Sequence, residues 1–187
     1  MVVGISLRAI MAKYFSQKDV LELYIFFKHK QIKVWLDGGW GVDALLGQET
    51  RFHQDLDIVI QQKDLFLCCK ALESRGYSEI TRDDTCAWNF VLGDNAGREI
   101  DIHVISIDNN GNGIYGPAER GIFYPVESLM GIGSINGVEI NCLNPEYQVQ
   151  SHTGYNLKDK DFKDVFALCK KFNIPLPPEY RTQKHLK

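Results

Sequence analysis

This 187-residue sequence lacks any pair of cysteines spaced as C-x-x-C, and its five cysteines are an odd number. A disulfide framework and a zinc site of the usual spacing are therefore not indicated, and reduced thiols are the simplest reading. The apolar stretch 1–12 is a poor signal peptide, because Arg8 interrupts it and no charged region precedes it. It is also far too short to span a membrane. We expect a soluble, cytoplasmic protein with no membrane partner.

An excess of charge of either sign is also missing. The 21 basic and 24 acidic residues leave a net charge of −3, and no basic stripe runs along the chain, so no nucleic-acid partner is indicated. Lysines within 158–171 alternate with acids, which is typical of a solvated helix face. With 44% hydrophobic residues, a chain of this length can bury a core of its own.

Local patterns predict an α/β (α+β) fold, in which helices flank a small mixed β-sheet and a helical C-terminal part follows. The Asn- and Gly-rich stretch 107–120 is typical of a mobile loop. We expect a core domain over 1–143 and a helical extension over 144–187, packed as a single compact unit. Apolar spacing and turn residues predict helices over 16–30, 40–46, 63–75 and 159–172, and a further helix that starts at 144–146. They also predict a hairpin formed by 87–92 and 98–105, and strands over 32–36, 55–60, 122–126 and 138–143.

Two aspartates lie two positions apart on one predicted strand. Asp55 and Asp57 then project from the same face, while Leu56 and Ile58 point into the core. Two carboxylates this close repel each other unless a cation lies between them, and carboxylate oxygens suit Mg²⁺. An isolated Asp-x-Asp is more often a solvated pair, so this pattern alone is weak.

Two further features strengthen the interpretation. Asp101 and His103 alternate with apolar residues on another predicted strand, so they share the face turned away from the core. Three acids on one sheet face can hold two cations about 3.5–4 Å apart. Upstream, Gly38-Gly39 lies at a strand-to-helix turn, where backbone N–H groups can cradle a phosphate.

Three segments together resemble a known family. They are 34–44 with its Gly-Gly-Trp, 50–57 with Arg-Phe-His-Gln-Asp-Leu-Asp, and 101–103 with Asp-Ile-His. They are similar to the lincosamide nucleotidyltransferases and, more distantly, to the aminoglycoside adenylyltransferases, both of the DNA polymerase β-type nucleotidyltransferase superfamily. The resemblance covers roughly 18–170 and includes 151–155, which is similar to a His-Ser-Gly-Tyr segment of the lincosamide enzymes.

The resemblance implies an enzyme that moves a nucleoside monophosphate, AMP from ATP or the equivalent from another triphosphate, onto a hydroxyl of a small molecule. A lincosamide or aminoglycoside antibiotic is the implied acceptor, and pyrophosphate is released. Asp55 and Asp57 would ligate Mg²⁺, with two ions expected. Asp101 would complete the metal site, accept the proton of the attacking hydroxyl, or do both. The implied nucleotide-binding residues are Gly38, Gly39, Trp40, Arg51 and His53, and the candidates on the acceptor side are His103, His152 and Tyr155.

Several of these candidate site residues also have a purely structural interpretation. Trp40 is typical of a packing residue, and Asp43 favours a cap or a local salt bridge. His152 and Tyr155 either line the acceptor pocket or join a helix to the sheet. Asp161 and Asp164 match an acidic helix of the antibiotic enzymes, yet their pattern favours a solvated helix face.

The sequence is compatible with two other functions and leaves the oligomeric state undetermined. A nucleotidyltransferase of a toxin–antitoxin pair would modify a partner protein, although such enzymes usually lack an extension like 144–172. A catalytically inactive relative would bind nucleotide alone, although all three acids are present. Related enzymes often build sites between subunits, so a homodimer also stays open.

Overall fold

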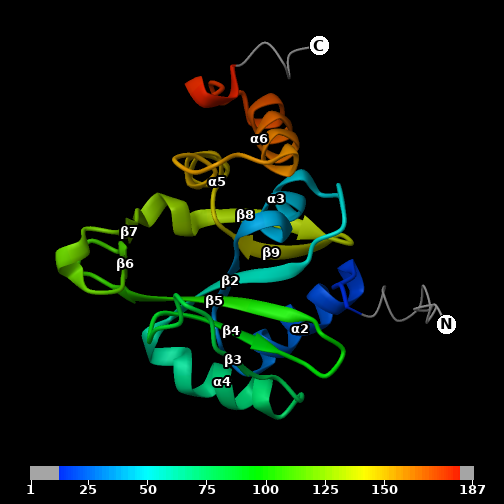
Figure 1. Cartoon of the computed structure of the whole chain (residues 1–187), viewed down its shortest axis with the longest axis vertical. Helices are drawn as coiled ribbons and strands as arrows, with labels where there is room; N and C mark the ends of the chain where they lie inside the picture. Colours follow the sequence, from blue (N-terminus) through cyan, green and yellow to red (C-terminus); the bar gives the residue numbers. More distant parts are fainter. Residues whose placement is uncertain (1–12, 182–187) are drawn as a thin grey trace.

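The fold is built on a single mixed β-sheet, in a computed structural model that describes residues 13–181. Its main strands follow the spatial order β3-β4-β5-β2-β1-β9-β8, and β6 and β7 form an arm beyond β5 (Figure 1). The strands are β1 (Val34–Leu36), β2 (Asp55–Gln61), β3 (Ser78–Ile80), β4 (Asn89–Gly93), β5 (Glu99–Ile107), β6 (Gly113–Tyr115), β7 (Phe123–Tyr124), β8 (Gly131–Ile135) and β9 (Val138–Cys142).

Helices cover both faces of this sheet. Figure 1 shows α2 (Gln17–His29) and α4 (Leu65–Glu73) on one side, with α3 (Gly38–Leu46), α5 (Pro145–Ser151) and α6 (Asp159–Phe172) on the other. The predicted mixed α/β class is therefore confirmed. Between residues 13 and 181, no helix has the length and apolar content needed to cross a membrane.

Caps encoded in the sequence fix where the helices begin. Ser16 Oγ accepts a hydrogen bond from the Asp19 amide at 3.2 Å, and the Asp19 carboxylate accepts one from the Ser16 amide at 2.9 Å, which completes a capping box on α2. Asn144 caps α5 by accepting from the Tyr147 amide at 2.8 Å, with Pro145 in the first turn. The predicted starts of these two helices are confirmed.

The pairing of β2 with β5 determines which side chains meet on the sheet. The two strands run parallel, with Asp57 opposite Asp101 and Asp55 opposite Glu99. Strand β4 pairs antiparallel with β5 as the predicted hairpin, whose turn is held by hydrogen bonds that the Asp94 side chain accepts from the amides of Ala96 and Arg98 at 2.9 Å.

The main core includes the face of β2 and β5 that packs against α2 and α4, and it continues to residues of α3, α5 and α6. Leu56, Ile58, Ile100 and Ile102 are almost completely buried in it. Because side chains alternate along a strand, Asp55, Asp57 and Asp101 must face the opposite side, toward α3. The hydrophobic pattern thus places all three acids on one face.

Three local expectations were wrong or incomplete. The stretch 107–120 is not a loop throughout, because β6 lies within it and pairs with β5, after a turn in which Asp108 accepts from the amides of Asn110 and Asn112 at 2.8 Å. Strands β3 and β8 had no sequence signal strong enough to predict them. Strand β8 has the sequence Gly-Ile-Gly-Ser-Ile, in which glycines argue against a strand on propensity alone.

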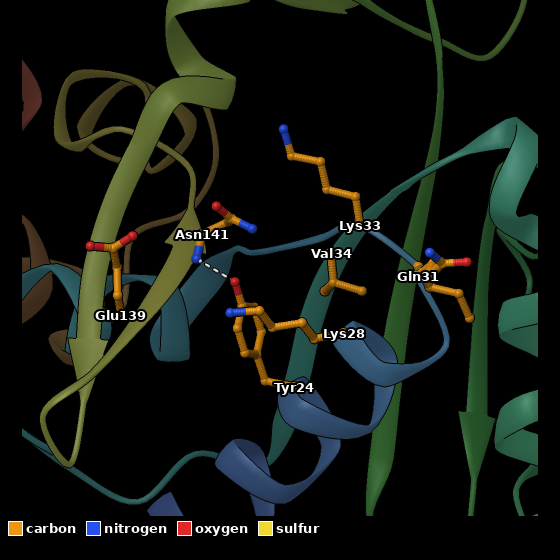
Figure 2. A pocket seen from close by; sticks show the side chains of 8 residues that line it. Tyr24, Lys28, Gln31, Lys33, Val34, Glu139 and Asn141 are labelled. Carbon is orange, nitrogen blue, oxygen red and sulfur yellow. Dashed lines mark hydrogen bonds between the residues drawn. The ribbon is translucent and has the colours of Figure 1, made fainter.

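Strands β1 and β9 pair at a single position, Leu36 with Cys142, at the C-terminal end of both strands. Just before this pair, the Asn141 amide donates to the Tyr24 hydroxyl of α2 at 2.9 Å (Figure 2). A cavity of about 400 Å³ remains here, lined by residues that include Lys28, Lys33 and Glu139. Tyr24 thus satisfies a backbone donor that the sheet leaves unpaired.

Gly133 of β8 allows α3 to pack directly on the sheet, because a Cβ at this position would overlap the backbone of Ala44. We expect Gly133→Ala to lower the free energy of unfolding by about 1–3 kcal/mol, since a backbone clash cannot be relieved by a rotamer change. Urea denaturation followed by circular dichroism measures it. Ser134→Ala is the matched control and should change stability by less than about 0.5 kcal/mol; equal effects of the two variants would contradict the packing argument.

Candidate active site

A cleft of about 280 Å³ opens between the first turn of α3, the start of β2 and the C-terminal helices. It brings together most of the residues selected from the sequence, although they come from segments more than 100 positions apart. The residues that line it are Gly38, Gly39, Arg51, His53, Asp55, Asp57, His152, Tyr155, Lys158, Lys160 and Asp161.

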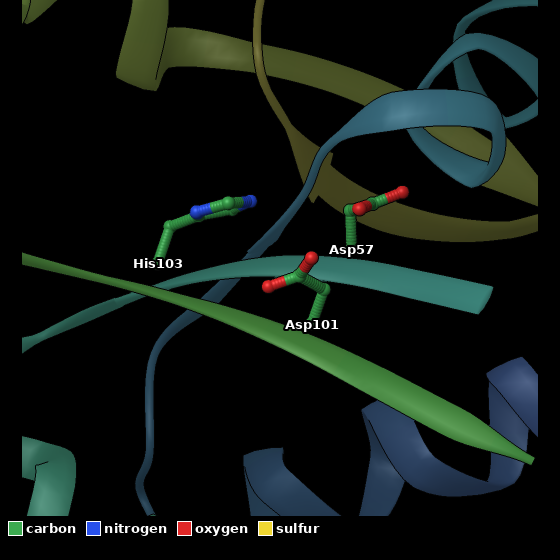
Figure 3. Close-up of side chains that lie close together, drawn as sticks. All are labelled: Asp57, Asp101 and His103. Carbon is green, nitrogen blue, oxygen red and sulfur yellow. The ribbon is translucent and has the colours of Figure 1, made fainter. Parts of the chain in front are cut away.

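An acid cluster lies on the sheet next to this cleft. Asp57, Asp101 and His103 each place one ligand atom so that all three atoms lie within 4.8 Å of one another (Figure 3). Asp55 lies two positions before Asp57 and lines the cleft itself. The Asp55 carboxylate is close enough to interact electrostatically with both Asp57 and Asp101, so all three acids belong to one cluster.

The electrostatics of the cluster favour a bound cation. Burial raises the pKa of Asp57 well above its usual value, and the neighbouring Asp55, Asp37 and Asp101 carboxylates raise it further. Burial likewise raises the pKa of Asp101, and the neighbouring His103 lowers it by a smaller amount. Among the described residues, Asp101 Oδ1 is buried and finds no hydrogen-bond partner. A divalent cation would neutralise the repulsion and occupy that oxygen.

The glycines at the start of α3 are needed for close approach. Gly38 has φ 52°, and a Cβ there would overlap the Asp57 carboxylate. A Cβ on Gly39 would overlap the His53 ring and crowd the Arg51 guanidinium. Asp37 caps the helix by accepting from the Gly38 amide at 2.7 Å. The helix start thus lies directly against Asp57, His53 and Arg51, and a helix N-terminus of this kind is where backbone N–H groups can contact a phosphate.

A buried polar unit supports the floor of the cleft. His53 Nε2 lies 2.5 Å from Asp43 Oδ2, and both residues are 2% exposed. Asp43 also accepts from the amide and hydroxyl of Thr50, at 3.1 and 2.6 Å. The Trp40 ring lies 4.7 Å from the His53 ring and is itself buried. Asp43 thus makes the structural kind of contact expected of it, although its partner His53 lies ten positions away, and Trp40 is a buried packing residue.

The acidic face of α6 is buried, which corrects the expectation of a solvated helix face. Asp164 accepts two hydrogen bonds from Arg51, at 2.6 Å from Nη2 and 3.3 Å from Nε, and Asp161 accepts one from the Lys158 amide at 2.7 Å. Both aspartates are 2% exposed. Their positions relative to Val165 and Leu168 are those of one buried helix face, a spacing signal that the abundance of charge obscured.

The start of α6 also contributes two residues that the sequence did not single out. Lys158 and Lys160 line the cleft, and Lys160 lowers the pKa of Asp57. His152 and Tyr155 line the same cleft, and the Tyr180 hydroxyl donates to the His152 carbonyl. The C-terminal segment is therefore one wall of the cleft.

Comparison with known proteins agrees with this arrangement. The family described as aminoglycoside-2''-adenylyltransferase matches residues 19–168. A lincosamide resistance protein of Staphylococcus haemolyticus is 28% identical over 153 residues, which cover 80% of this chain and 92% of that protein. The crystal structure of the lincosamide antibiotic adenylyltransferase LnuA with lincomycin bound has a TM-score of 0.73 and 27% identity, covering 87% of this chain and 99% of that one.

A more distant solved structure shares the fold alone. ANT(2'')-Ia in complex with adenylyl-2''-tobramycin has a TM-score of 0.62 and 15% identity, and the match covers 83% of this chain and 88% of that one. The protein is thus a nucleotidyltransferase. More particularly, it belongs to the aminoglycoside-2''-adenylyltransferase family, which confirms the resemblance found in the sequence.

The pair formed by Arg51 and Asp164 ties α6 to the loop before β2. We expect Asp164→Ala to lower the free energy of unfolding by about 3 kcal/mol, because a mostly buried guanidinium would lose its carboxylate. Chemical denaturation measures the loss. Asp159→Ala, an exposed acid on the same helix, is the control and should cost less than about 1 kcal/mol. A loss in Asp164→Ala no larger than in the control would show that the pair does not fasten the helix.

The acid cluster predicts a pH dependence of stability. A carboxyl group whose pKa is raised by folding stabilises the protein below its unfolded pKa, and that contribution is lost as pH rises through the folded pKa. Without divalent cations, wild type should therefore lose stability relative to Asp57→Asn as pH rises from about 4.

Magnesium should reverse this loss in the wild type only. An ion at 100 times its Kd adds about 2.7 kcal/mol if it binds the folded state alone. Thermal melts of both proteins across pH, with EDTA or with Mg²⁺, measure both effects. A wild-type protein whose stability relative to Asp57→Asn is independent of pH and of Mg²⁺ would contradict the electrostatic argument.

Proposed function

We propose that this protein is a Mg²⁺-dependent nucleotidyltransferase that moves AMP from ATP onto a hydroxyl of a small antibiotic. The observation that carries the proposal is the position of Asp57, which lies beside Asp101 across two parallel strands and against Gly38 at the start of α3. A cation site and a phosphate cradle therefore share one carboxylate. This is the geometry that transfer from a metal-bound triphosphate requires.

Two cation positions follow from the three acids. Asp55 and Asp57, which line the cleft, would hold one ion and neutralise charge on the triphosphate. Asp57 and Asp101 would hold the ion next to the attacking hydroxyl, and Asp101 would also accept the proton of that hydroxyl. When bound, the ions supply neutralisation of charge on the α-phosphate and on the leaving pyrophosphate.

The triphosphate would lie along the wall formed by α3 and α6. Its oxygens would face the first turn of α3 at Gly38 and Gly39 and the positive charges of Arg51, Lys158 and Lys160. Arg51 is already fixed by Asp164, so its guanidinium does not have to be ordered when the nucleotide arrives. His53 and Trp40 support this wall from below.

The acceptor would bind at the outer part of the cleft, beside His152 and Tyr155. Both residues line the cleft, and Tyr155 is exposed enough to contact a ligand. The two relatives at 27–28% identity are a lincosamide resistance protein and a lincosamide adenylyltransferase. A lincosamide is therefore the first acceptor to test, and an aminoglycoside the second.

The test is transfer of labelled nucleotide. We expect wild type to transfer label from ATP to a lincosamide or an aminoglycoside in the presence of Mg²⁺. Asp55→Asn, Asp57→Asn and Asp101→Asn should each lower kcat at least about 1,000-fold while the fold is retained, because each removes charge from the metal site. Thin-layer separation of the products and release of pyrophosphate give two independent readouts.

The control is Asp83→Asn, an exposed acid outside the cleft, which should keep wild-type activity. Circular dichroism of every variant separates loss of catalysis from loss of fold. No transfer by wild type to any acceptor of the panel, with each of the four nucleoside triphosphates, would reject the proposed function. Retained activity in any of the three metal-site variants would reject the metal assignment.

A further inference from the structure

A chain of hydrogen bonds runs from an exposed acid to the edge of the acid cluster. Asn89 Nδ2 donates to the Asp84 carboxylate at 3.2 Å, and the Tyr115 hydroxyl donates to Asn89 Oδ1 at 2.8 Å. The same hydroxyl lies 3.0 Å from His103 Nδ1. The chain therefore links Asp84, through Asn89 and Tyr115, to the imidazole beside Asp101.

These contacts allow His103 only one neutral tautomer. A carboxylate can only accept, so Asn89 must turn its NH₂ group toward Asp84 and its carbonyl oxygen toward Tyr115. The single hydroxyl hydrogen of Tyr115 is used in that bond, so the hydrogen between Tyr115 and His103 must come from Nδ1. The lone pair of His103 is then on Nε2, the ring nitrogen that points toward Asp57 in Figure 3.

The His103 ring lies close to the carboxylates of Asp57 and Asp101, and one oxygen of Asp101 is without a partner among the described residues. Atoms of Asp57, Asp101 and His103 lie within 4.8 Å of one another, and the buried Asp101 Oδ1 has no hydrogen-bond partner among residues 13–181. A nitrogen lone pair next to two carboxylates has nothing to accept from them when they are ionised. A cation satisfies all three groups at once.

We infer that His103 Nε2 is the third protein ligand of the ion held by Asp57 and Asp101, and that this position favours a first-row transition-metal ion over Mg²⁺. The inference rests on the proposed function for the presence of a divalent ion, and it adds the nitrogen ligand and its consequence. Imidazole suits transition metals, whereas Mg²⁺ prefers a shell made of oxygens.

The two ion positions then differ in chemistry. Asp55 and Asp57 offer only oxygens, which triphosphate oxygens would complete, so this position remains suited to Mg²⁺. Tyr115 is a positioning residue: it holds Nδ1–H and thereby directs Nε2 at the ion, as outer-shell partners of metal-bound histidines do. In this arrangement His103 binds the ion, and His152 and Tyr155 are the residues that contact the acceptor.

The experiment uses Mn²⁺ as a paramagnetic probe on the full-length protein without nucleotide. Pulsed electron paramagnetic resonance detects a ¹⁴N nucleus bonded to Mn²⁺, and protein grown with ¹⁵N-histidine shifts that signal. We expect a histidine nitrogen coupling in wild type, its loss in His103→Asn, and its retention in His29→Asn, where an exposed histidine at the end of α2 is replaced.

Affinity provides the second readout. Competition titrations should show wild type preferring Mn²⁺ to Mg²⁺ at least about tenfold, with the preference lost in His103→Asn. Tyr115→Phe keeps the imidazole and should retain the nitrogen coupling while weakening Mn²⁺ binding about tenfold. This variant also tests the chain of hydrogen bonds if His103→Asn fails to fold, which circular dichroism would reveal.

Three results would overturn the inference: no Mn²⁺ binding to wild type, bound Mn²⁺ without a histidine nitrogen coupling, or the same coupling in His103→Asn. Unchanged Mn²⁺ affinity in Tyr115→Phe would reject the positioning role. Labelled-nucleotide transfer by the same preparations separates the two proposals. Transfer without nitrogen coupling rejects only the ligand, and nitrogen coupling without transfer to any acceptor rejects only the proposed function.

Discussion

The parallel pairing of β2 with β5 is the constraint on which the rest of the site depends. It places Asp57 directly opposite Asp101, although 44 positions separate them in the chain, and it leaves two half-buried carboxylates in mutual repulsion. The hydrophobic effect sustains this arrangement, because Leu56, Ile58, Ile100 and Ile102 are buried on the other face of the same strands. A slip of one residue would exchange the two faces and bury the acids in the core. The fold thus maintains an electrostatic repulsion that a bound cation would relieve.

The remaining walls of the cleft serve that cluster. Helix α3 approaches Asp57 closely because Gly38 and Gly39 have no side chains. It also packs directly on β8, because Gly133 has no side chain to keep the backbone of α3 away. From the C-terminal side, the buried pair of Arg51 with Asp164 holds α6 over the loop before β2. The lysines at the start of α6 therefore face the carboxylates and partly compensate their charge. Preorganised charge of this kind is the main means by which a phosphoryl-transfer site acts.

Membership of the aminoglycoside-2''-adenylyltransferase family agrees with the residues found in the cleft. These residues indicate the type of reaction more clearly than the identity of the acceptor. In the function we propose, the acids, the glycine turn and the cationic wall act on a triphosphate and would serve any hydroxyl brought to them. The residues proposed to distinguish one acceptor from another are His152 and Tyr155, which line the same cleft. In the arrangement we propose, the hydrogen bonds from Asp84 through Asn89 and Tyr115 to His103 would distinguish one ion position from the other rather than one acceptor from another.

The sequence by itself determined where α2 and α5 begin and the face on which the acids lie, because helix caps and strand alternation are local properties. Ser16, Asn144 and the alternation around Asp55 and Asp57 were sufficient. It could not determine that Asp161 and Asp164 are buried, since a charged residue on a helix is solvated unless a distant partner such as Arg51 meets it. Nor could it predict β8, whose glycines make sense only against α3. The tautomer of His103 likewise depended on Tyr115 and Asn89, which reach it from two other strands. Contacts between residues far apart in the chain decide charge burial and proton position, and those contacts exist only in the folded protein.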